Sequence, residues 1–301
     1  MIPDVSIIIL SWNTRDLLAR CLEALYDTLE GLTFDVWVVD NASTDDSVEM
    51  VQSKFPSVYL VTNFTNEGFA RANNNTMPLS QGRYMLLLNS DAFVTSGAVR
   101  SLVSLADAQP HAGIVGARLL NLDGTFQASH TPFPTLWREF LILTGLGRLV
   151  KGYWYPSRGP EVEKGPQLAD YVEGACMLVR RQAFEEVGGL DEGYFMYSEE
   201  VDWCYSMREH GWQVWYQPDA KVIHVGGGSS QLRMPQREAD LYRSLVRFFR
   251  KYYGERKTIL LTWQIHAFTA LKIAMHGLLR FVSGGRWGRP VARLQDLRGD
   301  R

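Results

Sequence analysis

The sequence has few cysteines, and their spacing excludes two kinds of small protein. Cys21, Cys176 and Cys204 are the three cysteines among 301 residues, and no two of them form a Cys-x-x-Cys pair. An odd number of widely spaced cysteines suits a reducing compartment better than a disulfide framework. A zinc site built on cysteines is unsupported for the same reason.

The sequence also lacks an excess of charge and a leader-like N-terminus. Its 31 Lys and Arg nearly balance 33 Asp and Glu, so no overall charge draws the chain to nucleic acid or to an anionic surface, and any such contact must be local. We therefore expect no nucleic-acid partner. The first residues show no basic segment followed by a long apolar stretch and a cleavage site, from which we expect a cytoplasmic location.

Short apolar runs alternate with segments of helical period in the first 120 residues. Alternation of this kind predicts an α/β fold, a Rossmann-like and mostly parallel sheet flanked by helices. After the first expected strand, Ser11-Trp12-Asn13 stands where a dinucleotide-dependent oxidoreductase would carry G-x-G-x-x-G, which argues against that enzyme class. The expected strands are rich in β-branched or aromatic residues and comprise residues 5–10, 36–39, 58–61, 84–88 and 114–117.

The pattern changes after about residue 121. Asp123-Gly124 predicts a hairpin turn, and residues 131–165 are rich in Pro, Gly and aromatics without clear periodicity, which is typical of a mobile or acceptor-facing loop. Regular structure is expected again as a strand at residues 171–180 and helices at 182–187 and 198–209.

The last part of the chain predicts an amphipathic helical tail. Residues 258–282 are apolar but interrupted by His266, Lys272 and His276, and burying the lysine in a bilayer would cost about 3 kcal/mol. We therefore expect an interfacial helix on a membrane surface, with a helix packed on the rest of the chain as the alternative. The expected organisation is two halves of one domain, residues 1–120 and 121–254, followed by the tail, residues 255–301.

Polar residues follow four of the expected strands, where ligands bind in parallel α/β sheets. Asp40 comes directly after a buried strand, and we favour contact with a base or ribose over helix capping because Ser43 and Thr44 are nearer caps. The polar strand ends are Ser11 with Asn13, Asp40 with Asn41, Thr62 with Asn63, and Asn89 with Ser90 and Asp91.

Two of these regions suit a diphosphate. The loop from Asn66 contains Gly68, which permits close backbone approach, and Arg71, which can pair with a phosphate oxygen, although a glycine-capped polar loop is also a common structural feature. Asp91 offers a carboxylate to a divalent cation, with Asn89 as a neutral partner on the same side of the chain. Read alone, an Asx-turn explains Asp91 better.

Two later features carry candidate chemistry. Ser198 is the expected N-cap of a helix that begins with Glu199 and Glu200, whose charges complement the helix dipole. The same field would lower the pKa of a carboxylate and keep it ionised, as a general base requires. His224 precedes a glycine run and is a candidate ligand for metal or diphosphate, although a lone histidine is more often structural.

Together these residues resemble the inverting family 2 glycosyltransferases with the GT-A fold, especially the rhamnosyltransferase-like branch. The resemblance implies that Asp40 binds the nucleoside and that Asn89-Ser90-Asp91 is a DxD-type motif for Mg²⁺ or Mn²⁺. It also implies that Glu199-Glu200 bears the catalytic base. The resemblance covers about residues 5–254 and rests on VSIIILSWN (5–13), VVDNASTD (38–45), NEGFARAN (66–73), GACMLVRR (174–181) and GLDEGYFMYSEEVD (189–202).

Two positions depart from the family pattern. Asn89 replaces the first acid of the metal motif, so Asp91 and His224 would carry more of the metal binding. Glu200 stands where the pair usually ends in Asp, and we select it as the base, with Glu199 as the fallback. The predicted donor-binding residues are Ser11, Asn13, Asp40, Asn41, Asn66, Gly68, Arg71, Asn89 and Ser90.

The resemblance further implies transfer from a nucleotide-diphosphate sugar to a glycan or lipid-linked glycan. The rhamnosyltransferase-like branch favours dTDP-rhamnose as donor, with UDP-sugars open. The departures keep a degenerate, inactive glycan-binding protein as an alternative. A sugar nucleotidyltransferase fits less well because the chain lacks an early glycine-rich basic loop. Peripheral binding to the inner face of the cell membrane and a homodimer are both compatible with the sequence.

Overall fold

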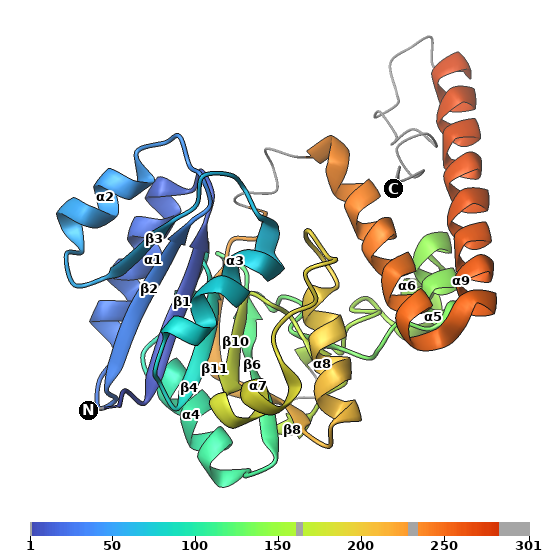
Figure 1. Cartoon of the computed structure of the whole chain (residues 1–301). Helices are drawn as coiled ribbons and strands as arrows, with labels where there is room; N and C mark the ends of the chain where they lie inside the picture. The colour runs from blue at the N-terminus through green and yellow to red at the C-terminus, as the bar shows by residue number, and fades with distance from the viewer. Residues whose placement is uncertain (1, 161–164, 228–233, 283–301) are drawn as a thin grey trace. The chain divides into compact units, whose positions relative to one another are not determined.

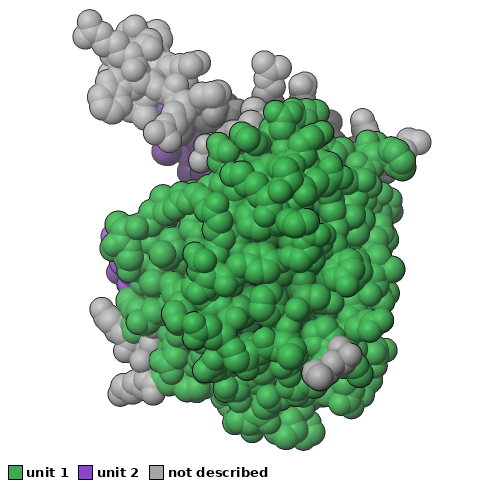
Figure 2. All heavy atoms as spheres, turned by 90° about the vertical axis from the view of Figure 1, so that its left-hand side faces the viewer, with its two compact units in different colours: residues 1–133, 157–231 green, residues 134–156, 232–301 purple. Residues whose placement is uncertain are grey.

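The computed structural model describes residues 2–160, 165–227 and 234–282 (Figure 1). The chain forms two compact units. Unit 1 comprises Met1–Phe133 and Ser157–Gln231, and unit 2 comprises Pro134–Pro156 and Leu232–Arg301. The face drawn in Figure 2 is made almost entirely by unit 1. The predicted functional boundaries at residues 120 and 254 stay predictions.

A nine-stranded sheet forms the centre of unit 1, in the order β3-β2-β1-β4-β10-β6-β11-β5, with β8 paired to β11. A second, two-stranded sheet pairs β7 with β9. The strands are β1 (Val5–Ser11), β2 (Phe34–Asp40), β3 (Tyr59–Thr62), β4 (Tyr84–Asn89), β5 (Ala92–Val94), β6 (Ala112–Leu120), β7 (His130–Thr131), β8 (Gln167–Leu168), β9 (Tyr171–Val172), β10 (Cys176–Arg180) and β11 (Gln213–His224).

The first four strands of the sheet run parallel, which brings their carboxyl ends to one edge. β1 pairs with β2 from Val5↔Phe34 to Ser11↔Asp40, and it pairs with β4 up to Leu10↔Asn89. β10 then runs antiparallel to both β4 and β6. The side chains of β1 explain its central place: Ile7, Ile8 and Ile9 are fully buried, and each such burial contributes about 1.5–3 kcal/mol.

Helices of unit 1 flank this sheet (Figure 1). In α1, the buried residues Leu18, Cys21, Leu22 and Leu25 recur at helical spacing. The helices of unit 1 are α1 (Arg15–Thr28), α2 (Ser47–Lys54), α3 (Gly68–Thr76), the 3₁₀ turn η1 (Met77–Leu79), α4 (Ala98–Ala108), α7 (Arg181–Val187) and α8 (Glu199–Glu209).

Unit 2 is helical in its described part. It contains α5 (Leu136–Thr144), α6 (Leu146–Lys151) and α9 (Met234–Val282). Gly254 has φ 78° and ψ 168°, so α9 is two helices separated by a kink. Phe140 of α5 meets Phe268 of α9 edge to face at 5.9 Å between ring centroids. Among the described residues, no helix is long and apolar enough to cross a membrane.

Several predictions of local structure are confirmed and others are wrong. All five predicted strands of the first 120 residues form, and the hairpin turn closes with Asn121 N–H donating to Thr125 O at 2.8 Å. The expected loop at residues 131–165 instead contains α5 and α6. The strand expected at residues 171–180 is interrupted between β9 and β10.

The predicted helix caps are also wrong. Ser198 adopts a left-handed φ of 65° and makes no side-chain cap hydrogen bond to α8. α2 begins at Ser47 rather than after Ser43 or Thr44, because Ser43 N–H donates to Asp40 and Thr44 N–H donates to Asn13 in a longer turn. These turn hydrogen bonds take the place that capping was expected to fill.

Candidate active site

The carboxyl ends of β1, β2 and β4 bring three predicted site residues together. The sheet register sets Ser11 beside Asp40 and Leu10 beside Asn89. Asn41 N–H donates to Ser11 O at 2.8 Å, which continues the pairing past the end of β2. The sequence therefore predicted this edge correctly, since parallel strands must end at the same side of a sheet.

Asp40 is buried, with 3% of its surface exposed, and uses one of its two carboxylate oxygens. Oδ2 accepts from Ser43 N–H at 2.9 Å. Oδ1 is inaccessible and has no hydrogen-bond partner among the described residues. Leaving a buried acceptor unsatisfied costs about 1–3 kcal/mol, so a ligand hydroxyl that reached this oxygen would remove that cost.

Asn41 and Asn66 hold the loop after β3 in place. Asn41 Oδ1 accepts from Asn63 Nδ2 and from Glu67 N–H, both at 3.0 Å. Its Nδ2 donates to Asn66 Oδ1 at 2.9 Å. Gly68 N–H also donates to Asn66 Oδ1, at 3.0 Å. The amide groups of Asn41 and Asn66 already form hydrogen bonds within the protein. Their predicted contact with the nucleotide-sugar remains a prediction.

Gly68 and Arg71 face another part of unit 1. Gly68 has φ +79°, and a Cβ added there would lie 2.5 Å from the carbonyl oxygen of Phe195. Phe69 N–H donates to that same oxygen at 3.0 Å. Arg71 Nε donates to Glu192 Oε2 at 3.0 Å on the surface. The glycine is therefore required by chain packing, and the arginine forms an ion pair with an exposed acid of the same chain.

A chain of hydroxyls links the ends of β1 and β4. Ser11 Oγ and Thr14 Oγ1 are 3.0 Å apart, and Thr14 Oγ1 lies 2.8 Å from Ser90 Oγ. Asn13, at a left-handed φ of 53°, accepts Thr44 N–H at 2.7 Å. These contacts fix the loops that surround Asp40 and Asp91.

Asp91 and His224 form the centre of the predicted metal site. Asp91 Oδ1 lies 3.3 Å from His224 Nε2, and both side chains are largely buried. Asn89 Nδ2 lies 3.5 Å from the same imidazole nitrogen. β11 pairs antiparallel with β5 through His224↔Ala92, which brings the histidine next to Asp91 across more than 130 residues of sequence. The three residues named as metal ligands from the sequence are thus neighbours.

Gln127 orients the imidazole of His224, and sequence reasoning missed it. Its Oε1 lies 2.7 Å from His224 Nδ1. Its Nε2 donates to Asn121 Oδ1 at 3.0 Å and to His224 O at 3.2 Å, which fixes the orientation of the amide. Nδ1 is therefore the donor, and a neutral imidazole presents the lone pair of Nε2 toward Asp91. Supporting contacts of this kind are typical of metal-binding histidines.

The donor set fits a divalent cation that is shared with a ligand. One carboxylate and one imidazole suit Mn²⁺, and Mg²⁺ is also held by few protein ligands when phosphates supply the others. In the described part of the chain, no group of three or more His, Cys, Asp or Glu side chains could hold a metal by itself. Asp91 and His224 would thus need the oxygens of a bound diphosphate or water to complete the coordination.

Glu200 lies in the first turn of α8, with its side chain against Gly174. A Cβ at Gly174 would be 3.6 Å from Glu200 Cβ. Burial raises the pKa of Glu200 to about 7, although hydrogen bonds from backbone groups at the start of α8 oppose the shift. The backbone groups at the start of α8 lower this pKa as expected, but desolvation of the carboxylate is the larger effect, so the expected net lowering of the pKa is wrong.

Two more acids lie beside Glu200: the buried Glu199 and the partly buried Glu173. Burial, and then the charge of Glu200, raise the pKa of Glu199, whose Oε2 has no hydrogen-bond partner among the described residues. Burial and Glu200 likewise raise the pKa of Glu173 to about 8. Tyr197 and Ser198, just before α8, have left-handed φ values of 72° and 65°, and such strain often accompanies functional sites.

Sequence reasoning also missed Glu173. It lies in the interruption between β9 and β10, next to the apolar run that was predicted as one strand. An acidic residue next to an apolar run was the sequence feature that could have indicated a site residue at Glu173. No local pattern indicated Gln127, because its partner His224 is distant along the chain.

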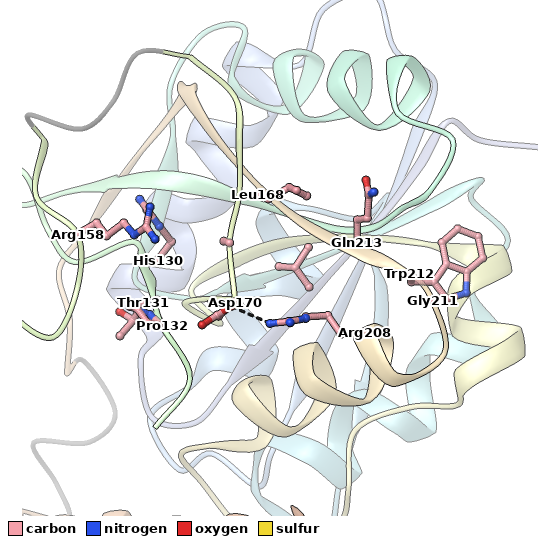
Figure 3. A pocket seen from close by; sticks show the side chains of 12 residues that line it. His130, Thr131, Pro132, Arg158, Leu168, Asp170, Arg208, Gly211, Trp212 and Gln213 are labelled. Carbon is pink, nitrogen blue, oxygen red and sulfur yellow. Dashed lines mark hydrogen bonds and ion pairs between the residues drawn. The ribbon is translucent and has the colours of Figure 1, made fainter. Parts of the chain in front are cut away.

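A cavity of about 370 Å³ lies elsewhere in unit 1, near the carboxyl end of α8 (Figure 3). Arg208 and Asp170 form an ion pair of 2.7 Å in its wall. His130 also lines it, and burial together with the charge of Arg158 lowers the pKa of this histidine to about 4. None of the predicted site residues lines this cavity, so it is separate from the candidate active site.

Comparison with known proteins identifies similar sequences among glycosyltransferases. Residues 6–188 match the model for Glycosyl transferase family 2. The N-acetylglucosaminyl-diphospho-decaprenol L-rhamnosyltransferase of Mycobacterium tuberculosis is 30% identical over 206 residues, which are 63% of this chain and 66% of that protein. The low-salt glycan biosynthesis hexosyltransferase Agl10 of Haloferax volcanii is 26% identical over 229 residues, 74% of this chain and 68% of that protein.

Solved structures share the fold at lower sequence identity. The mannosyltransferase PcManGT from Pyrobaculum calidifontis, in complex with GDP-Man and Mn²⁺, aligns with a TM-score of 0.59 and 18% identity over 94% of this chain and 80% of its own. GalNAc-T7 with UDP, GalNAc and Mn²⁺ aligns with a TM-score of 0.57 and 15% identity over 74% and 43%. These likenesses concern the fold. Since the family match takes in more than half of the chain, this protein belongs to glycosyl transferase family 2 and has the GT-A fold.

Proposed function

We propose that this protein is an inverting glycosyltransferase that moves a sugar from a nucleotide-diphosphate donor to a hydroxyl group of a glycan or lipid-linked glycan. The observation that carries the proposal is the set of groups at one edge of the sheet in unit 1. It comprises Asp40 with an unsatisfied oxygen and the Asp91–His224 pair, together with the partly buried acid Glu200 in the first turn of α8. Asp40 would bind the nucleoside, Asp91 and His224 would bind the diphosphate through a cation, and Glu200 would accept the proton.

Backbone contacts support a short separation between Glu200 and the Asn89-Ser90-Asp91 motif. The side chain of Glu200 packs on Gly174. The carbonyl oxygen of the next residue, Ala175, accepts the N–H of Asn89 at 3.0 Å. An acceptor hydroxyl at Glu200 would therefore lie close to a diphosphate bound at Asp91.

In the proposed reaction, Glu200 takes the proton of the acceptor hydroxyl while the acceptor oxygen forms a bond to the anomeric carbon. The bond from that carbon to the diphosphate breaks, and the nucleoside diphosphate leaves from the opposite face, so the configuration inverts. A base with a pKa of about 7 has both an ionised fraction and proton affinity near neutral pH. A divalent cation at Asp91 and His224 would offset the charge of the leaving diphosphate.

The proposed donor is dTDP-rhamnose. Its support is the family resemblance and a relative named as an L-rhamnosyltransferase, while UDP-sugars remain the alternative. That relative is also named for a decaprenol-linked substrate, which supports a lipid-linked acceptor. Such an acceptor would bring the reaction to the inner face of the cell membrane. Ser11, Asn13, Asn41, Asn66, Gly68, Arg71, Asn89 and Ser90 remain proposed as the surroundings of the donor.

The base assignment is tested by Glu200→Gln, with Glu209→Gln at the exposed end of α8 as the matched control. We expect Glu200→Gln to lower kcat by about 10²–10⁴, because the amide cannot take up the proton. Binding of the nucleotide with Mn²⁺, measured by calorimetry, should stay close to that of the unaltered chain. Turnover by Glu200→Gln similar to that of Glu209→Gln would contradict the assignment and move the role to Glu199 or Glu173.

A panel of nucleotide-sugars tests the reaction class. With Mn²⁺ present, release of nucleoside diphosphate supports glycosyl transfer or the accompanying donor hydrolysis, whereas pyrophosphate would indicate a nucleotidyltransferase. A chain that binds glycan but releases neither product with any donor or acceptor offered would support the degenerate alternative. That alternative is favoured by Asn89 in the metal motif and by the small set of protein ligands.

A further inference from the structure

Charge is strongly separated between the two units, although the whole chain is nearly neutral. Residues 134–156 and 232–301 carry 18 of the 31 Lys and Arg but only 6 of the 33 Asp and Glu. The remaining residues, those of unit 1, carry 13 basic and 27 acidic side chains. Unit 2 is thus a basic unit whose charge the overall composition hides, and an anionic surface would attract it and repel unit 1.

Unit 2 also exposes large apolar side chains on α5, on α6 and just after it. Trp137, Leu149, Val150 and Tyr153 are each 63–82% exposed. Basic residues stand among them: the guanidinium of Arg148 lies 5.6 Å from the ring centre of Tyr153. Isolated apolar residues on a surface are ordinary, but aromatic rings mixed with arginine and lysine are typical of segments that lie at a membrane interface.

The second half of α9 presents apolar residues on two sides. Leu261 and Ile265 are buried within unit 2. Leu260, Trp263 and Leu271 are more than half exposed, and the helical repeat of 100° per residue places them together on another side of the helix. Large apolar residues that stay exposed on a second side of a helix are typical of a surface that another apolar phase covers.

An anionic lipid surface matches both the positive charge and the exposed apolar side chains of unit 2. A second copy of the chain would bring the same excess of positive charge against itself, which opposes association. A helix crossing the bilayer is excluded for the described residues, whose Lys272 pairs with Glu238 at 3.4 Å instead. We infer that unit 2 docks on the surface of an anionic lipid bilayer through α5, α6 and the exposed side of α9.

This inference extends the expected membrane contact beyond the tail. Residues 134–156 lie within the segment 131–165 that was predicted as a mobile or acceptor-facing loop, and they contribute the exposed rings of Trp137 and Tyr153 to the surface. The docking does not depend on catalysis, so its failure and the failure of the proposed reaction can be told apart. Hydrolysis of nucleotide-sugars is measured without vesicles, and vesicle binding is measured without substrates.

The test is co-sedimentation of the full chain with vesicles of equal parts phosphatidylglycerol and phosphatidylcholine, compared with pure phosphatidylcholine. We expect strong binding to the anionic vesicles that weakens as salt is added. Trp137→Ser combined with Leu149→Ser and Tyr153→Ser should lower the partition coefficient by about tenfold or more. The matched control, Ile2→Ser with Leu79→Ser and Leu122→Ser, changes three exposed apolar residues of unit 1 and should bind normally.

Charge reversal tests the contribution of the basic residues separately. It also tests the inference if the triple variant does not fold. Arg148→Glu with Lys151→Glu changes two residues in the last turn of α6 and should weaken binding to anionic vesicles only. Equal binding of all variants would overturn the inference. A dimer in solution that the triple variant dissociates, together with absent vesicle binding, would assign the surface to a second copy instead.

Discussion

At the scale of single residues, the candidate site depends on groups whose hydrogen bonds are only partly satisfied by the protein. Asp40 has one oxygen bound and one without a partner among the described residues. His224 has one nitrogen held by Gln127 and the other directed at Asp91. Such groups are costly in an interior and are retained where a ligand completes them.

Gln127 provides a direct test of this arrangement. Gln127→Ala removes the acceptor for Nδ1, so the proton can move to Nε2 and block its lone pair. We expect the Mn²⁺-dependent affinity for nucleotide to decrease about 10-fold to 100-fold, measured by calorimetry with dTDP or UDP. Gln127→Glu retains an acceptor and should restore most of the affinity.

The matched control is Gln52→Ala, which removes an exposed glutamine on α2. It should leave nucleotide affinity unchanged with and without Mn²⁺. If Gln127→Ala behaves like this control, His224 is oriented by the strand alone and the amide has no part in metal binding.

Glu173 predicts how the stability of the fold changes with pH. Its pKa is raised from 4.5 to about 8, so the folded state holds a proton that the unfolded chain releases between these values. Stability therefore decreases as pH rises, by up to about 1.4 kcal/mol per pH unit. Glu173→Gln cannot ionise, so we expect its stability relative to the unaltered chain to increase from about pH 5 to pH 8.

Urea unfolding at several pH values measures this difference. Glu209→Gln, an exposed acid on α8, should run parallel to the unaltered chain at every pH. A Glu173→Gln curve that is also parallel would show that the carboxyl group of Glu173 is solvated or compensated in the folded state.

At the scale of elements, strands and helices with a clear period were predictable, and elements defined by distant partners were not. β1, β2 and β4 each contain a compact apolar run and appear where expected. β11 was not predicted: it spans 12 residues with exposed and buried positions mixed, and a bulge near Gln217 breaks its alternation. α5 was missed because aromatic residues obscured a short helical period.

Gly68 shows how one element depends on another. Gly68→Ala should destabilise the fold by about 2–4 kcal/mol, since the left-handed φ costs about 1–2 kcal/mol and the new Cβ would press on the Phe195 carbonyl. Gly97→Ala has nearly the same φ, +77°, with nothing within 4 Å. Gly97→Ala should therefore lower the free energy of unfolding only by the cost of the left-handed φ.

Unfolding by urea compares the two glycine variants directly. The difference between them isolates the contact with the segment before α8. Equal destabilisation would mean that this segment moves away freely, and that Gly68 is needed for its backbone conformation alone.

At the scale of the whole molecule, separation of charge and function by unit is the main organising feature. The proposed chemistry lies entirely in acidic unit 1, and the proposed lipid contact lies entirely in basic unit 2. The chain crosses between the units at residues 133–134, 156–157 and 231–232. The net charge of the whole chain is therefore near zero because the negative charge of unit 1 offsets the positive charge of unit 2.

The sequence by itself determined the α/β class, the parallel strand ends and the residues that gather there. This was possible because apolar periodicity sets the strands, and parallel strands deliver their ends to one edge. The tertiary structure alone decided the partners. It brought Gln127 to His224 and Glu173 beside Glu200, and it assigned residues 134–156 to unit 2. Contacts between distant segments depend on the packing of the whole chain, and local sequence does not encode them.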